Sequence, residues 1–163
     1  MSQKGFTLIE LLVAMAVGGI LMAGIVLTIF QVSWGSVRTN DQVVALTDVN
    51  YATLWLKKDL QMAQSTSLTD GVPASSVTLS WTDFTGWATE ETRDHSSTYA
   101  LSGTELRRTY DGTVRVVGRY ITSIGFTQNG RVVTIVITDT GPGVSQRVET
   151  LKFTVQMRTE ETQ

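Results

Sequence analysis

The feature that most constrains this chain is a long stretch without charge near its beginning. Between Glu10 and Arg38 the sequence contains no Lys, Arg, Asp, Glu or His. Within that stretch, residues 11–30 are apolar except for three glycines and one threonine. About 20 helical residues span about 30 Å, the thickness of the hydrocarbon core of a bilayer. The stretch therefore predicts one transmembrane helix, and Trp34 follows it where an interfacial aromatic is expected.

A short leader precedes this stretch. Residues 1–5 carry one cation, Lys4. By the positive-inside rule we expect the leader to stay in the cytoplasm and everything after Phe30 to be exported. Because cysteine is absent, disulfides, thiolate zinc sites and cysteine nucleophiles are excluded. The 13 Lys+Arg nearly balance the 15 Asp+Glu, so no strong field would gather nucleic acid, and we expect no nucleic-acid partner.

A second helical pattern covers residues 41–64. Its apolar residues recur at spacings of three and four and predict one buried stripe of an amphipathic helix, with Asp59 and other polar residues between them. The stripe consists of Leu46, Val49, Ala52, Leu56, Leu60 and Ala63. No proline occurs before Pro73, so the two helical patterns predict one continuous or slightly bent helix. Gly35 and residues 39–41 are the expected places for a break or a new cap.

The pattern then changes from helix to strand. Residues 65–76 are rich in turn formers, and residues 82–97 predict a long loop. Two dipeptides, Asp111-Gly112 and Asn129-Gly130, each separate two strand patterns and predict two-residue hairpins. The strand patterns cover residues 77–81, 105–110, 114–121, 124–128, 131–138 and 151–158.

These patterns define the expected fold class and domains. We expect an α+β fold, in which the outer half of a long N-terminal helix lies across a mostly antiparallel sheet of about five to seven strands. The leader is residues 1–5 and the helix is residues 6–64, with a transmembrane part at 6–34 and an amphipathic part at 41–64. The β-rich globular domain is residues 65–163.

Constellations that could carry chemistry are weak in this domain. His95 lies between Asp94 and Ser96, but residues adjacent in sequence are poorly placed to converge on one reacting atom, so an ordinary surface histidine is expected. A possible calcium group matches no EF-hand loop, and a solvated acidic loop is the better interpretation. That group is Asp83, Glu90, Glu91 and Asp94. We therefore expect no catalytic residue, cofactor, metal or small-molecule substrate.

Two further groups are interpreted as ordinary structure. Four arginines on neighbouring predicted strands could form a basic patch, but acidic residues nearby and alternating strand faces favour a solvated surface. They are Arg107, Arg108, Arg115 and Arg119. Three aromatic residues are expected to belong to the core. They are Trp81, Phe84 and Trp87.

The most informative residues begin the apolar stretch. In the run Gly5-Phe6-Thr7-Leu8-Ile9-Glu10, one carboxylate stands inside an apolar segment. A carboxylate there is unfavourable unless it stays near the interface or finds a cation, so Glu10 is a functional candidate. The run, with the apolar helix after it, closely resembles the N-terminus of type IV prepilins and type II secretion pseudopilins.

The resemblance implies processing and assembly. A prepilin peptidase would cleave after Gly5 and N-methylate the new N-terminal Phe6. The amine of Phe6 in one subunit would then pair with Glu10 of the next, since an α-amine and a glutamate carboxyl are ordinarily both charged at neutral pH. Glycines 18, 19 and 24 either allow close helix packing or let this segment stretch during assembly.

The resemblance also implies a role, partners and a location. The chain would be a non-enzymatic minor pseudopilin or pilin that helps to initiate or cap a filament. The stretch 99–108 loosely resembles J-type minor pseudopilins of type II secretion. Partners would be the prepilin peptidase, other minor and major pseudopilins or pilins, the inner-membrane assembly platform and membrane lipid. The helix would cross the cytoplasmic membrane once, with the globular domain periplasmic or extracellular.

Three alternatives stay open. Glu10 could interact only with its own helix N-terminus or with Phe6 of the same chain, a stabilisation of about 0.3 to 1 kcal/mol. The segment could be a secretory signal peptide cut after residues 14–16, although Glu10 interrupts its apolar run. The chain could also be a signal-anchored binding or enzymatic domain unrelated to pilins.

Overall fold

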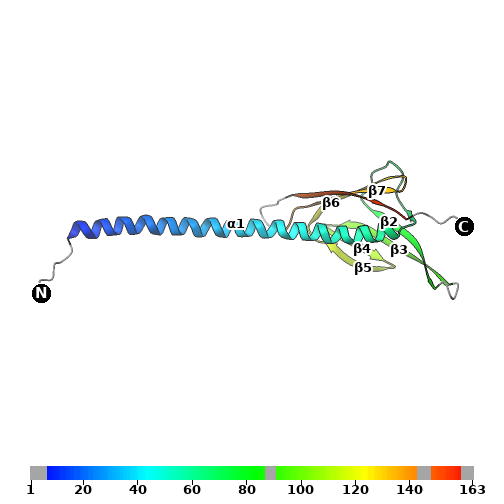
Figure 1. The fold of residues 1–163 in the computed structure, drawn as a ribbon, viewed down its shortest axis with the longest axis horizontal. Coiled ribbons are helices and arrows are strands. Elements are labelled where there is room, and N and C mark those ends of the chain that lie inside the picture. The colour runs from blue at the N-terminus through cyan, green and yellow to red at the C-terminus, as the bar shows by residue number, and fades with distance from the viewer. Residues whose placement is uncertain (1–6, 87–90, 143–147, 159–163) are drawn as a thin grey trace. The chain divides into compact units, whose positions relative to one another are not determined.

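The computed structural model describes residues 7–86, 91–142 and 148–158. The chain divides into two compact units, Met1–Asn40 and Asp41–Gln163. One helix, α1, spans Leu8–Met62 and contributes residues to both units (Figure 1). The fold class is the expected α+β arrangement of a long N-terminal helix packed against antiparallel sheets.

Helix α1 is continuous, as the absence of proline predicted. The helical assignment passes through Gly35 and through residues 39–41 without interruption. Thr39 does not cap a new helix, because its hydroxyl donates to the Gly35 carbonyl oxygen four residues earlier, at 3.0 Å. Such a bond keeps a threonine hydroxyl satisfied inside a helix.

The first unit exposes its apolar side chains. Its most apolar part has no buried residue, and among the described residues α1 is the one helix long and apolar enough to cross a membrane. The exposed fractions are 82% for Leu8 and 67% for Trp34. An exposed apolar surface of this extent is unfavourable in water. Lipid or other helices are the surroundings that suit it.

The second unit contains eight described strands in two antiparallel sheets. The larger sheet has the order β1-β2-β3-β4-β5, and the smaller has the order β6-β7-β8. The larger comprises β1 (Ser65–Thr66), β2 (Val77–Gly86), β3 (Glu91–Ser102), β4 (Glu105–Tyr110) and β5 (Thr113–Gly118). The smaller comprises β6 (Ile121–Asn129), β7 (Val132–Asp139) and β8 (Glu149–Gln156). The prediction of a single sheet was therefore wrong.

The predicted loop at 82–97 was also wrong. Most of it forms the ends of β2 and β3, which pair from Val77↔Tyr99 to Gly86↔Glu91. Polar residues dominate this region because one face of the sheet is solvated. On that face Thr82 donates a hydrogen bond to Asp94 Oδ1 at 2.8 Å. A strand whose outward residues are all polar resembles a loop in sequence.

Both predicted hairpins are present. Asp111 and Gly112 occupy the first turn with φ angles of 45° and 82°, as a two-residue turn with positive φ at both positions requires. In the second hairpin Asn129 pairs with Val132, so the two-residue loop is Gly130-Arg131, one residue later than expected. Gly130 has a φ of 57° there.

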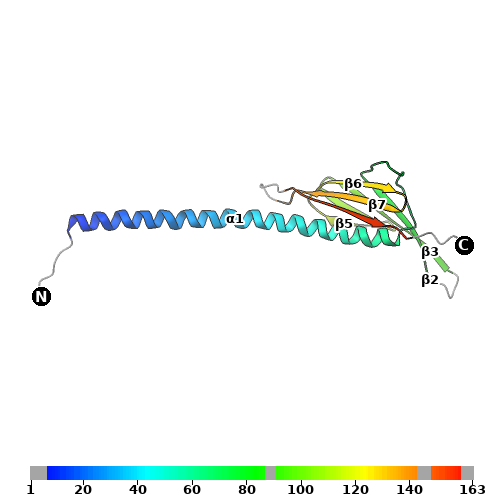
Figure 2. The same cartoon turned by 45° about the horizontal axis from the view of Figure 1, so that its top comes forward.

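The core lies between the second part of α1 and the two sheets. In both views the helix from residue 41 onward lies along the strands (Figures 1 and 2). Five of the six predicted stripe residues are buried, but Leu46 is 42% exposed and fully buried Ala45 takes its place on the inner face. The sheets contribute further buried side chains, among them Leu79, Tyr99, Leu106, Phe126, Ile135 and Ile137.

Candidate functional site

The N-terminal motif is partly described. Gly5 and Phe6 lie outside the described residues. Thr7 precedes α1, and Glu10 lies in its first turn. The amide and the hydroxyl of Thr7 each lie 3.2 Å from Glu10 Oε2, and the Glu10 amide lies 3.4 Å from Thr7 Oγ1. This reciprocal arrangement is a capping box, with threonine at the N-cap and glutamate three residues later.

The capping box shows that Glu10 does interact with its own helix N-terminus, which was one of the open alternatives. Its bonds use Oε2 and the amide of Glu10, which leaves Oε1 for a further donor. Glu10 is exposed in the isolated chain. The cap and a contact with a second subunit are therefore compatible, because a carboxylate offers about four acceptor positions. Thr7 and Glu10 form the T-x-x-E signature of a capping box, so this cap could have been predicted from the sequence.

A buried polar network joins α1 to the larger sheet. Asp59 is fully buried. Its Oδ2 accepts hydrogen bonds from Ser97 Oγ at 2.7 Å, Tyr99 Oη at 2.7 Å and Arg108 Nε at 2.6 Å. Its Oδ1 accepts a bond from Arg108 Nη2 at 2.9 Å. One helix residue thus contacts both β3 and β4.

Aromatic rings enclose the cation of this network. The Arg108 guanidinium carbon lies 4.8 Å from the Trp55 ring centroid and 4.6 Å from that of Tyr110. Burial tends to lower the pKa of Arg108, but the bond and the charge of Asp59 outweigh burial and raise it. Burial first, and the Asp59 charge second, raise the pKa of Tyr99 far above its ordinary value. Arg108 is therefore a cation and Tyr99 a neutral donor at neutral pH.

This network corrects two expectations. Asp59 was assigned to the polar side of the helix, and Arg108 to a solvated surface. Asp59 follows Leu56 by three residues and precedes Ala63 by four, so helical spacing alone places it on the buried stripe. Asp59 was nevertheless assigned to the polar side because an isolated buried carboxylate is unfavourable without a partner. The partner lies 49 residues later.

His95 is half-buried and not an ordinary surface side chain. Its Nδ1 lies 2.6 Å from Asp111 Oδ2, and its ring stacks on Tyr110 with centroids 5.6 Å apart. The Ser96 amide, and then the bond to His95, hold the pKa of Asp111 below its usual value. Ser96 thus contributes its amide, and Asp94 bonds to Thr82. The sequence-adjacent trio does not converge on one point.

The remaining candidates are the acidic group, the aromatic group and the exposed arginines. Among the described residues, no group of three or more acidic or histidine side chains is placed to hold a metal. Glu90 and Trp87 lie outside the described residues, as do the side chains of Glu91 and Phe84. Trp81 belongs to the core, as expected. Arg107 is exposed and pairs with Glu105 at 2.8 Å.

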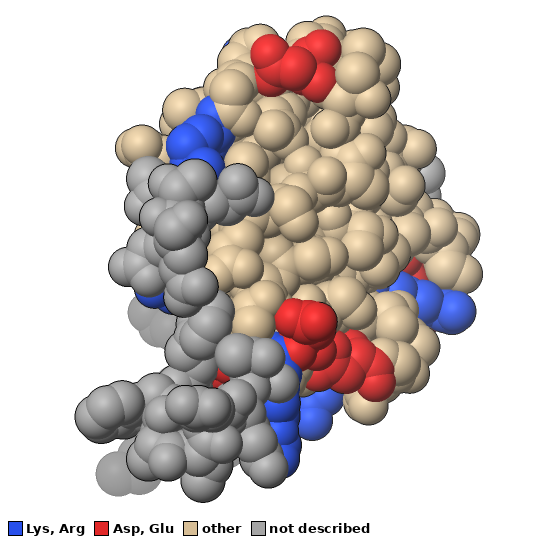
Figure 3. Space-filling view, turned by 90° about the vertical axis from the view of Figure 1, so that its right-hand side faces the viewer, with Lys and Arg blue, Asp and Glu red and all other residues tan. Residues whose placement is uncertain are grey.

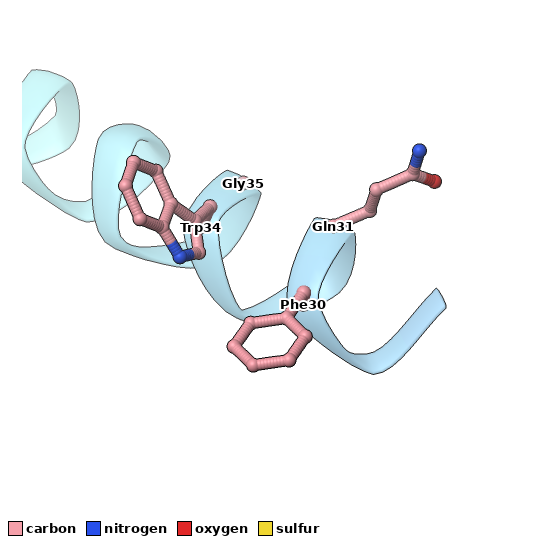
Figure 4. Close-up of a pocket in the computed structure, with 4 residues that line it drawn as sticks. All are labelled: Phe30, Gln31, Trp34 and Gly35. Carbon is pink, nitrogen blue, oxygen red and sulfur yellow. The ribbon is translucent and has the colours of Figure 1, made fainter. Parts of the chain in front are cut away.

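Two surface depressions occur in the described part of the chain. One is apolar and lies on a single stretch of α1, lined by Phe30, Gln31, Trp34 and Gly35 (Figure 4). The other lies beside the ends of β2 and β3 and is lined by hydroxyl groups, Asp94 and His95. In both cases the lining shows no convergent group of catalytic residues. One face of the β domain is mostly uncharged, with scattered Lys, Arg, Asp and Glu (Figure 3).

Comparison with known families decides the identity of the N-terminus. Residues 1–26 match the family model of the prokaryotic N-terminal methylation motif. The match supports a type IV pilin-like protein. The match covers the leader, Glu10 and the first part of the apolar helix, and not the β domain. No curated protein matches the chain. Pilin-like proteins are structural subunits that assemble with other pilins.

Proposed function

We propose that this pilin-like protein is a minor pseudopilin or minor pilin, a structural subunit that helps to initiate or cap a type II secretion pseudopilus or a related filament. The observation that carries the proposal is the methylation motif at residues 1–26, with Glu10 as the sole charge at the start of the apolar helix. The second part of α1 and the two sheets form one core, and the first part of α1 is the one described helix apolar enough to cross a membrane. This combination suits a subunit that packs its helix into a bundle of similar helices.

Processing prepares the subunit for assembly in this proposal. The leader at residues 1–5 is removed after Gly5 by a prepilin peptidase, and the amine of Phe6 is methylated. Residues 6–34 lie in the cytoplasmic membrane with the leader inside. The amphipathic part of the helix, at 41–64, and the β domain, at 65–163, then stand in the periplasm or outside the cell. The partners are the assembly platform and the other pilin subunits.

Glu10 then acts as the axial register of the bundle. Apolar contacts between helices are not directional and would let the helices slide. A carboxylate held by the Thr7 cap faces outward and can receive the amine of Phe6 from a neighbouring subunit. A buried ion pair of this kind gives position more reliably than stability. The role needs no catalytic residue, cofactor, metal or small-molecule substrate.

The experiment that tests the proposal is mass spectrometry of the N-terminus of protein extracted from membranes. The expected mature chain begins at an N-methylated Phe6, and Gly5→Val should leave the leader attached because it replaces the glycine of the proposed cleavage site. Gly18→Ala, outside the junction, serves as the matched control and should be processed normally. An intact Met1 in the native host would favour a signal-anchored domain, and a chain beginning near Val17 would favour signal peptidase.

A further inference from the structure

The edges of the two sheets differ in what lies against them. The β8 edge lies against α1, where Gln42 donates to Glu149 Oε1 at 2.9 Å and Lys57 lies over the Phe153 ring. The β6 edge is bridged at Phe126 by Ala74, from the segment before β2. At the other end of the larger sheet, β1 has only two residues. Within the described chain, β5 pairs only with β4.

The hairpin geometry shows which groups this open edge presents. Tyr110 and Thr113 close a two-residue hairpin and form a hydrogen-bonded pair, and bonded and non-bonded pairs alternate along antiparallel strands. Val114, opposite Thr109, and Val116, opposite Arg107, are then non-bonded pairs. Their amide and carbonyl groups point away from β4. Unpaired groups in a row are a template for an added strand.

The side chains of the β5 edge determine which residues are favoured in an added strand. Val114 and Val116 share one face and are 56% and 40% exposed. Arg115 lies on the other face, exposed and directly opposite Arg108. Like charges opposite each other are unfavourable, and Arg108 is already neutralised by Asp59. Arg115 has no ion-pair partner among the described residues.

From these observations we propose that the β5 edge is a docking site for an extended segment of a partner protein in which apolar and acidic residues alternate. The segment adds as a further strand of the larger sheet. Its apolar residues cover Val114 and Val116, and a carboxylate beside Arg115 supplies the missing countercharge. The site is built by the β4–β5 hairpin alone, so it does not depend on how the N-terminus is processed or anchored.

The test uses ¹⁵N-labelled full-length protein in neutral detergent micelles and two synthetic peptides. The first alternates valine with glutamate over six residues, and the second alternates valine with lysine. The acidic peptide should shift the amide signals of Val114 and Val116 and slow their hydrogen exchange. The basic peptide should bind at least about tenfold more weakly, because it places a second cation beside Arg115. Equal binding, shifts centred on another strand, or no shift at millimolar peptide would overturn the proposal.

Three variants sharpen the result. The Val114 amide points outward and makes no hydrogen bond to β4. Val114→Pro removes this amide and should weaken binding of the acidic peptide by about tenfold. Val114→Ala keeps that amide and is the matched control, with binding within about threefold. Arg115→Glu should reverse the preference between the peptides while leaving the hairpin intact, so it decides the matter even if the proline variant misfolds. Retention of the acidic preference by Arg115→Glu would contradict the proposed charge recognition.

Discussion

Glu10 and Asp59 are two carboxylates on one helix, in two regions with opposite surroundings. Asp59 lies in the second unit, fully buried, with four hydrogen bonds from Ser97, Tyr99 and Arg108. Glu10 lies in the first unit, exposed, and among the described residues its hydrogen-bond partner is Thr7. A charge satisfied within the subunit holds the fold together. We propose that the exposed charge at the start of the apolar helix serves assembly.

The largest expected effect comes from breaking the buried network. Asp59→Ala leaves Arg108 buried without a countercharge, and loss of one partner of a buried pair costs about 3–5 kcal/mol. We expect the free energy of unfolding of the β domain to fall by that amount, measured by urea denaturation in mild detergent with tryptophan fluorescence. The double variant Asp59→Leu/Arg108→Met should recover much of the loss. Equal losses in both variants would show that packing, and not the ion pair, sets the cost.

The next effect compares two leucines on opposite faces of the helix. Leu56 is fully buried, whereas Leu54 is 66% exposed. Leu56→Ala should lower the free energy of unfolding by about 2–5 kcal/mol, because it removes buried methyl groups and leaves a cavity. Leu54→Ala, the matched control, should change it by less than about 0.5 kcal/mol. The same urea titration measures both, and similar values would place the buried face of α1 elsewhere.

A smaller effect, of opposite sign, is expected at Asp139. Asp139 is fully buried, its Oδ1 accepts the Gly141 amide at 2.6 Å, and its Oδ2 has no hydrogen-bond partner among the described residues. Burial raises the pKa of this carboxyl, and the nearby charge of Asp48 adds to the shift. A carboxyl whose folded pKa exceeds its unfolded pKa destabilises the fold above both values, and this penalty disappears as pH falls below them.

Asp139→Asn should therefore stabilise the domain by about 1 kcal/mol at neutral pH. The gain should shrink as pH is lowered towards the unfolded pKa of aspartate, because the native carboxyl then becomes neutral as well. Thermal unfolding at a series of pH values measures the difference between the two proteins. A gain that does not change with pH would assign the effect to hydrogen bonding and not to charge.

The parts of the fold that sequence could predict are those set by local chemistry. The dipeptide Asp111-Gly112 predicted the first hairpin because both residue types tolerate positive φ. The lack of proline predicted that α1 is continuous. Helical spacing places Asp59 on the buried stripe, but its partner Arg108 is brought near only by the folded sheet, so the local sequence does not predict the ion pair. The strands at 82–97 were missed for the same reason, since their inward residues are defined by the core on which they pack.

Of the candidate site, Glu10 was found from its position alone, because a single charge inside an apolar segment is conspicuous. The bonds from Thr7 add what the local sequence also encodes, a cap that holds the carboxylate. The partner proposed for Glu10 belongs to another subunit. Its test therefore has to measure assembly and not folding.

The most direct measurement is the assembly of Glu10→Leu. The variant makes the helix more apolar and leaves the Gly5–Phe6 bond unchanged, so membrane insertion and processing should persist. Entry into the filament should fail, because the Phe6 amine of the adjoining subunit loses its partner in a low-dielectric bundle, at a cost of several kcal/mol. Glu10→Asp, which keeps the charge, is the control. Cross-linking to partner pilins, with a secretion or pilus assay, should show a processed, membrane-resident and inactive protein, whereas wild-type assembly and activity would reduce Glu10 to a helix cap.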